Sequence, residues 1–151
     1  MDNLIAIVSA FFGCLGFSFV FRISKNLRFG VLGSFVGAIG WSIYLCTSYL
    51  NNTFFQSFIA MLCVSLISEV LARIMKAPAT IFIMIGFFPL VPGSGIYYTM
   101  LYAVQGKTDL FMESFINTIG ISLSLAFAIL LSSTLFHIYK RIKNKDYATI
   151  E

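Results

Sequence analysis

The residues best suited to binding a small solute interrupt an apolar run. Pro89 and Pro92 stand three residues apart, and Gly93-Ser94-Gly95 follows directly. A proline has no N–H to donate and its ring clashes with the preceding turn, so a continuous helix cannot pass through this segment. The backbone groups freed there suit binding. N–H groups at the start of the next helix attract a carboxylate, and carbonyl groups at the end of the previous one attract an ammonium group or a cation.

This spacing, Pro-x-x-Pro-Gly-x-Gly, predicts an unwound binding point between two half-helices, the second starting near Ile96. Unwound backbone in a bilayer is tolerated only where protein buries it or where it lines a polar cavity. In transporters such breaks hold the substrate. The alternative is a packing kink with no ligand. The candidate substrate-binding residues are Pro89, Pro92, Gly93, Ser94, Gly95 and Tyr97.

Charged side chains end the preceding apolar segment. Glu69 and Arg73 are four residues apart, which puts them on one helical face in the favourable order, and Lys76 lies near that face. The simpler interpretation is an ion pair that reaches towards the lipid headgroups. The functional interpretation is a gating charge pair at the cytoplasmic mouth of a solute pathway, with Glu69 as a candidate proton site.

The chain lacks the residue patterns of an enzyme or a metal site. It has no nucleophile–base pair and no acidic dyad; the one histidine is His137, and Cys14, Cys46 and Cys63 fall in separate apolar segments. We therefore expect no enzyme, no cofactor and no metal, and free cysteines that act as small apolar residues. The net charge of +4 does not indicate a nucleic-acid partner, because the cations lie at the ends of apolar segments.

The composition predicts a membrane protein. Of 151 residues, 59% are hydrophobic and 11% are charged, and the mean hydropathy is +0.92. We expect one all-α polytopic domain over residues 1–151, embedded in the lipid bilayer. Because Asp2 and no cation precedes the first apolar run, we expect that run to stay attached and not to be a signal peptide. The expected spans are about 4–21, 29–50, 54–72, 78–105 and 115–138.

Positive charges predict the orientation. The cations that follow the first, third and fifth spans are Arg22, Lys25, Arg28, Arg73, Lys76, Lys140, Arg141, Lys143 and Lys145. The loops after the second and fourth spans hold only Lys107, beside Asp109. With positive residues inside, the N-terminus is outside and the C-terminus is cytoplasmic. A re-entrant hairpin over 78–105 would put the cationic tail outside, so we expect a full crossing with a break in its middle.

The second span carries Gly30, Gly33, Gly37 and Gly40, a stripe of small residues that lets another helix approach closely. Packing within the chain is the expected use, and dimerisation is the alternative.

The stretch from Ala72 to Tyr97 resembles the signature of the ThrE-type threonine/serine exporters. The matching residues are Ala72-Arg73, Lys76-Ala77-Pro78-Ala79-Thr80, Gly86 and Pro89-Leu90-Val91-Pro92-Gly93-Ser94-Gly95-Ile96-Tyr97. In size and span count, the whole chain is similar to the short YjjB-like subunits, which correspond to the C-terminal membrane half of longer exporters.

This resemblance implies a multi-pass exporter subunit in the bacterial plasma (inner) membrane. The substrates it implies are small amino acids or carboxylates, threonine and serine or a succinate-like dicarboxylate, and the partner it implies is a YjjP-like membrane subunit. An odd number of spans also cannot form two equal inverted halves, which favours a second subunit or a homo-oligomer. The alternative is a non-transporting scaffold or regulator. If the break binds substrate, a bulky residue at Gly93 should abolish export. The preferred substrate and the coupling ion stay open.

Overall fold

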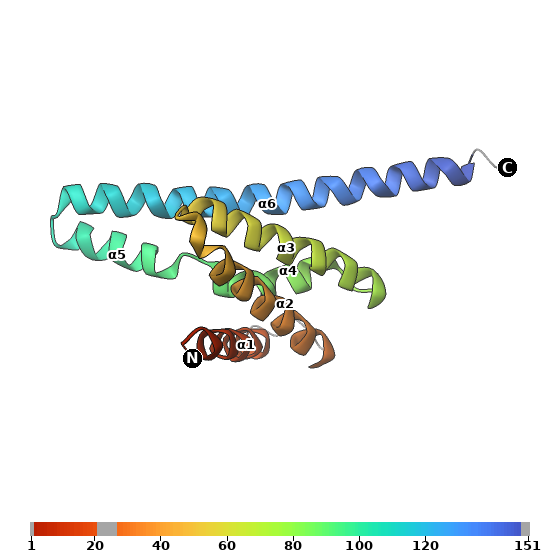
Figure 1. Ribbon diagram of the computed structural model, residues 1–151, viewed down its shortest axis with the longest axis horizontal. Coiled ribbons are helices and arrows are strands. Elements are labelled where there is room, and N and C mark those ends of the chain that lie inside the picture. The colour runs from red at the N-terminus through yellow and green to blue at the C-terminus, as the bar shows by residue number, and fades with distance from the viewer. Residues whose placement is uncertain (1, 21–26, 149–151) are drawn as a thin grey trace.

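The computed structural model describes residues 2–20 and 27–148, and every regular element in these ranges is helical (Figure 1). The elements in order are α1 (Asp2–Val20), α2 (Leu27–Cys46), the 3₁₀ turn η1 (Thr47–Leu50), α3 (Thr53–Ile74), α4 (Ala79–Phe87), the 3₁₀ turn η2 (Phe88–Leu90), α5 (Gly93–Val104) and α6 (Thr108–Ala148). Of the cations used to predict the orientation, Arg22, Lys25 and the side chains of Lys140, Arg141, Lys143 and Lys145 lie outside the described residues.

Four helical stretches are long and apolar enough to cross a membrane: residues 3–20, 27–50, 53–74 and 108–138. The fifth candidate is a bent pair, Ala79–Leu90 and Gly93–Val104, whose two parts meet at 55°. The prediction of an all-α protein is therefore confirmed in the described residues, with four candidate membrane spans, or five if the bent pair is one span.

The last helix begins earlier than the sequence suggested. The fifth span was expected over about 115–138, after a polar loop, but α6 starts at Thr108 and continues for 41 residues. Asp109 lies in its first turn, where a carboxylate interacts favourably with the positive end of the helix dipole. At about 1.5 Å per residue, α6 is about 62 Å long, roughly twice a hydrocarbon core of about 30 Å.

The break between α4 and α5 is short. The turn η2 contains Pro89, and only Val91 and Pro92 separate it from α5. The expected start of the second half-helix near Ile96 is too late: α5 begins at Gly93, and the Ile96 N–H already donates to the Pro92 carbonyl at 3.1 Å. Pro92 has no N–H to lose at this boundary, which explains why the helix starts directly after it.

The glycine stripe of α2 is used for packing within the chain. An ideal Cβ at Gly33 would come within 2.8 Å of Ile85 in α4, and one at Gly37 within 2.5 Å of Cys14 Sγ in α1. A Cβ at Gly40 would collide with Val64 in α3. α2 is therefore the centre on which α1, α3 and α4 pack. The core around it comprises Val36, Ala60, Met61, Val64, Leu90, Leu125 and Ala128.

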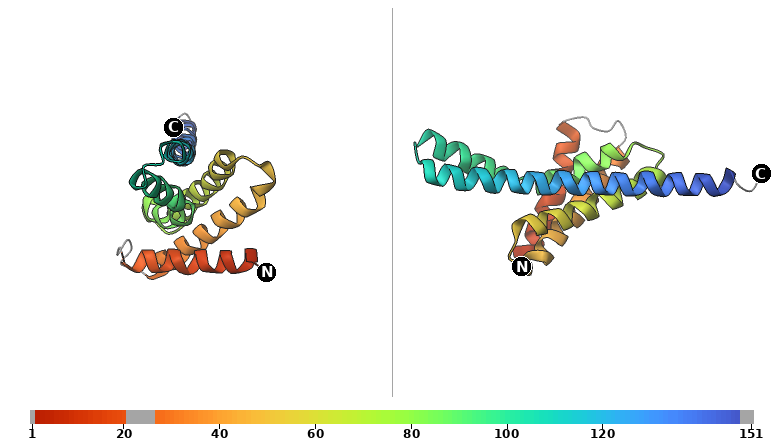
Figure 2. Two further views of the ribbon diagram at one scale, coloured as in Figure 1. Left: turned by 90° about the vertical axis from the view of Figure 1, so that its left-hand side faces the viewer. Right: turned by 90° about the horizontal axis from the view of Figure 1, so that it is seen from above.

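α5 and the N-terminal part of α6 form a hairpin, the α5–α6 limb, that projects from the other helices (Figure 1). Among the described helices, α5 packs only on α6, and α6 packs on α3 and α5. Figure 1 shows α3 and α6 running side by side in the same direction, with the α5–α6 hairpin projecting past the start of α3. Figure 2 shows α1 lying across the direction of α6. A cavity lies between the hairpin and the rest of the bundle, next to the helix break.

Candidate functional site

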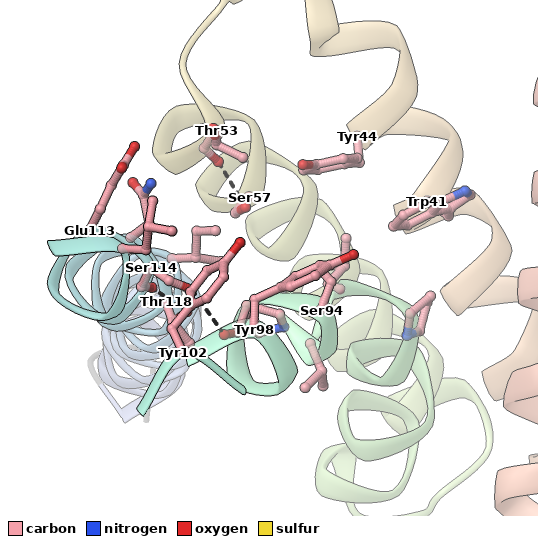
Figure 3. Close-up of a pocket in the computed structure, with 18 residues that line it drawn as sticks. Trp41, Tyr44, Thr53, Ser57, Ser94, Tyr98, Tyr102, Glu113, Ser114 and Thr118 are labelled. Carbon is pink, nitrogen blue, oxygen red and sulfur yellow. Dashed lines mark hydrogen bonds between the residues drawn. The ribbon is translucent and has the colours of Figure 1, made fainter. Parts of the chain in front are cut away.

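A cavity of about 470 Å³ lies at the break. Five parts of the chain surround it: α2, the start of α3, the break itself, α5 and the first half of α6. Figure 3 shows Glu113 on one side of the cavity and Trp41 on the other, with the rings of Tyr98 and Tyr102 between them. The polar side chains that line it are Tyr44, Thr53, Ser57, Ser94, Tyr98, Tyr102, Glu113, Ser114, Asn117 and Thr118.

Free backbone donors lie at the start of α5. The Gly93 N–H donates to the Val91 carbonyl at 2.7 Å, and the Ile96 N–H donates to the Pro92 carbonyl. Between them, the N–H groups of Ser94 and Gly95 have no partner within the described part of the chain. Both residues line the cavity. A helix N-terminus with free N–H groups favours an anion, so this side of the cavity suits a carboxylate.

The groups that suit a positive charge lie across the cavity, on α6. Glu113 and Asn117 are one helical turn apart there, and neither side chain has a hydrogen-bond partner among the described residues. Tyr98 and Tyr102 stack with ring centroids 6.1 Å apart and line the space beside them. A free carboxylate with aromatic rings beside it suits an ammonium group.

Hydroxyl groups fasten α5 to α6 at the edge of the cavity. The Gly95 carbonyl accepts from the Thr99 hydroxyl at 2.7 Å and from the Ser114 hydroxyl at 3.3 Å, and these two hydroxyls are 3.0 Å apart. The Thr118 hydroxyl donates to the Ser114 carbonyl at 2.7 Å. These groups are occupied by the fold, and they hold the start of α5 at a fixed distance from Glu113.

Four of the six predicted binding residues line this cavity: Pro89, Pro92, Ser94 and Gly95. The other two are placed differently. An ideal Cβ at Gly93 would meet nothing within 4 Å, and the residue does not line the cavity. Tyr97 is 62% exposed and contacts Tyr98 edge to face at 5.4 Å. The structure therefore puts the second half of the Gly-Ser-Gly motif at the site and turns its first glycine away.

Several lining residues were missed in the sequence. Ser94, Tyr98 and Tyr102 recur every four residues, and so do Glu113 and Asn117. Spacing of four puts side chains on one helical face, and it would have identified both faces of the cavity. Trp41, Tyr44 and Ser57 come from α2 and α3. No local pattern marks them, because only the packing of distant segments brings them to the break.

The predicted charge pair lies at a different place. Glu69 and Arg73 line a second cavity, of about 400 Å³, with Ser133, Phe136 and His137 of α6. The guanidinium carbon of Arg73 lies 4.8 Å from the centre of the Phe136 ring. Lys76 does not line this cavity. It adopts a left-handed backbone conformation with φ of 51°, just past the C-terminus of α3.

Across residues 2–20 and 27–148, no group of three or more His, Cys, Asp or Glu side chains could hold a metal ion. A family model described as "Threonine/Serine exporter, ThrE" matches residues 6–135, which include the whole lining of the first cavity and, of the second, all but Phe136 and His137. Comparisons with curated proteins and with solved structures give no match.

Proposed function

The chain belongs to the threonine/serine exporter family ThrE, and we propose that it is a membrane subunit of a secondary exporter whose substrate, a zwitterionic amino acid, binds in the cavity at the helix break. The observation that carries this proposal is the opposite polarity of the two sides of the cavity. The free N–H groups of Ser94 and Gly95 would receive the carboxylate of the substrate. The carboxylate of Glu113 and the faces of Tyr98 and Tyr102 would receive its ammonium group.

The same polarity argues against a succinate-like dicarboxylate. A dicarboxylate would bring its second negative charge to the side of the cavity that carries Glu113. Like charges at short range repel, most strongly where water is scarce. We therefore propose threonine and serine as substrates in preference to succinate. The amide of Asn117 is suited to bond the hydroxyl group that threonine and serine share.

We also propose that α4 and α5 together make one broken crossing. Since α3 and α6 run in the same direction, the chain must return across the bilayer between them, and α4–α5 is the intervening segment (Figure 1). A re-entrant loop would make α3 and α6 antiparallel. This supports five spans in a bacterial inner membrane, with the N-terminus outside and the C-terminus in the cytoplasm, as the positive charges predict.

A partner subunit completes the proposal. Among the described helices α5 packs on α6 alone, and its outer faces expose Ile96, Tyr97 and Met100 at 51%, 62% and 66%. Glu113 is also exposed, so the cavity has an open edge at this limb. A YjjP-like membrane subunit seated there would close the edge and exclude water from the bound amino acid.

Efflux from cells tests the proposal. Cells without their own exporter would receive this chain, the YjjP-like subunit or both, and would be loaded with labelled threonine, serine or succinate. We expect efflux of threonine and serine only when both chains are present. Efflux from this chain alone would point to a homo-oligomer. No efflux in any combination, with both chains detected in the membrane, would favour the scaffold function.

The Glu113→Gln variant links the efflux to the cavity. Its matched control is Asp109→Asn, one turn earlier on α6 and outside the cavity lining. We expect the first variant to weaken threonine efflux and the second to leave it unchanged. Equal efflux from the parent and both variants would remove Glu113 from the site.

A further inference from the structure

Three serine hydroxyls are buried in the membrane bundle without a hydrogen-bond partner. Ser65 and Ser68 on α3 are 0% exposed and Ser132 on α6 is 1% exposed. In the part of the chain that the structure describes, the Oγ atom of each has no partner. A buried polar group without a partner costs free energy, so three such groups need an explanation.

Other helical hydroxyls in this chain do not behave this way. Those of Ser34, Ser42 and Ser124 donate to the carbonyl four residues earlier, at 2.8, 2.8 and 2.9 Å. Hydroxyl groups in helices use this bond to avoid being unpaired in an apolar environment. Ser65, Ser68 and Ser132 forgo it although they are fully buried. Their oxygen lone pairs are therefore free for a ligand.

The three serines lie at one level of the α3–α6 interface. An ideal Cβ at Gly120 would touch Phe54, and Glu69 shares a cavity with Ser133. Residues of these two parallel helices that differ by 64 to 66 in number therefore lie opposite each other. This offset puts Ser132 opposite residues 66–68 of α3, within one turn of both Ser65 and Ser68.

The carboxylate of Glu69 and the second cavity lie next to the three serines. Glu69 follows Ser68 directly and lies one turn beyond Ser65 on the same face of α3. It lines the second cavity with Arg73 and His137. Arg73 stacks on Phe136, and Glu69 has no ion pair within the described residues. Glu69 therefore supplies the negative charge next to the three free hydroxyls, while the positive charge of Arg73 lies over the Phe136 ring in the same cavity. On the other side, buried Met61 and Leu125 lie between the serines and the break.

We infer that Ser65, Ser68, Ser132 and Glu69 form a binding site for a small monovalent cation, sodium, reached through the second cavity. Hydroxyl and carboxylate oxygens are the ligands that hard cations prefer. A single carboxylate balances one positive charge and leaves a divalent ion undercompensated. The use of this site to couple export to an ion gradient rests on the function proposed above, whereas sodium binding itself does not.

Thermal melting of the purified full chain in detergent tests the site without any transport. Melting temperatures are compared in sodium chloride and in choline chloride of equal ionic strength. For the parent chain we expect a saturable rise of about 8 °C in sodium, the size that follows when the ion is about 100-fold above its Kd. Ser65→Ala, Ser132→Ala and Glu69→Gln should lose this rise. Ser124→Ala, whose hydroxyl bonds the Gly120 carbonyl, should keep it.

The choline series shows whether the variants are folded. Ser65→Ala and Ser132→Ala remove hydroxyls that have no partner, so without sodium they should melt at or above the temperature of the parent chain. A parent chain that melts equally in sodium and choline would overturn the inference. So would a sodium response that persists in Ser65→Ala and Ser132→Ala. Because no efflux is measured, failure of the site and failure of the export function are distinguishable.

Discussion

Replacing Gly95 with alanine tests the geometry of the break most directly. An ideal Cβ at this position would lie 3.4 Å from Thr118 Cβ and 3.5 Å from its Cγ2, and it would collide with its Oγ1. Thr118 is held in place by its bond to the Ser114 carbonyl at 2.7 Å, so it cannot turn away without losing that bond. The added methyl group must therefore push α5 away from α6.

Gly93→Ala is the matched control. Both glycines lie in the first turn of α5, and alanine at either position gains a similar helix preference of up to about 1 kcal/mol. The Cβ at Gly93 would meet nothing within 4 Å. The difference between the two variants thus isolates the collision at Gly95, which overpacking values put at about 1–3 kcal/mol. At roughly 3 °C per kcal/mol, Gly95→Ala should melt about 3–9 °C below Gly93→Ala.

Efflux should follow the same order. Displacing α5 moves the N–H groups of Ser94 and Gly95 away from Glu113, and each 1.4 kcal/mol of lost binding weakens affinity about tenfold. We expect Gly95→Ala to lose threonine efflux at low substrate concentration while Gly93→Ala keeps it. The double variant Gly95→Ala/Thr118→Ala removes the colliding oxygen and should recover most of the melting temperature. If Gly95→Ala and Gly93→Ala melt alike and export alike, the described contact between α5 and α6 is incorrect.

Three further substitutions test the cavity and the helix packing separately. Glu113→Gln should raise the threonine concentration needed for half-maximal efflux about tenfold, because the substrate's ammonium group loses its charged partner. The same variant should leave the melting temperature within about 1 °C, because the Glu113 carboxylate has no partner among the described residues. Tyr98→Phe should reduce efflux because Tyr98 lines the cavity, whereas Tyr97→Phe should not; equal efflux rates would place the phenol of Tyr98 outside the site. Gly37→Val should abolish recovery of folded protein in size-exclusion chromatography, because the added side chain would meet Cys14 Sγ and the Gly86 backbone. Its control is Gly16→Val, where an added Cβ would meet nothing within 4 Å, and this variant should be recovered at the parent level.

The helices and the break could be predicted because both depend on local features of the chain. Long apolar runs specify spans wherever they occur, and Pro89 and Pro92 interrupt a helix whatever surrounds them. The start of α6 was missed because the polar residues after Lys107 are typical of a loop. Their helical state depends on α5, which packs along this part of α6 and is fastened to it through Ser114.

The site was predicted in part for the same reason. Ser94 and Gly95 follow from the chemistry of a helix start, but the choice between Gly93 and Gly95 depends on which side of α5 meets Thr118. The test first expected at Gly93 therefore moves to Gly95. Trp41 and Tyr44 could not be found from local spacing, because α2 reaches the break only through the fold.

The separateness of the α5–α6 limb has a consequence for biogenesis. α4 has 9 residues and α5 has 12, and each is too short to be recognised alone as a span of about 20 residues. α5 also has no described helix to pack on except α6, which is synthesised after it. The position of α5 is therefore fixed only after α6 has been synthesised. A chain that stops after Gln105 would carry this segment into the membrane without the surface that fixes its position.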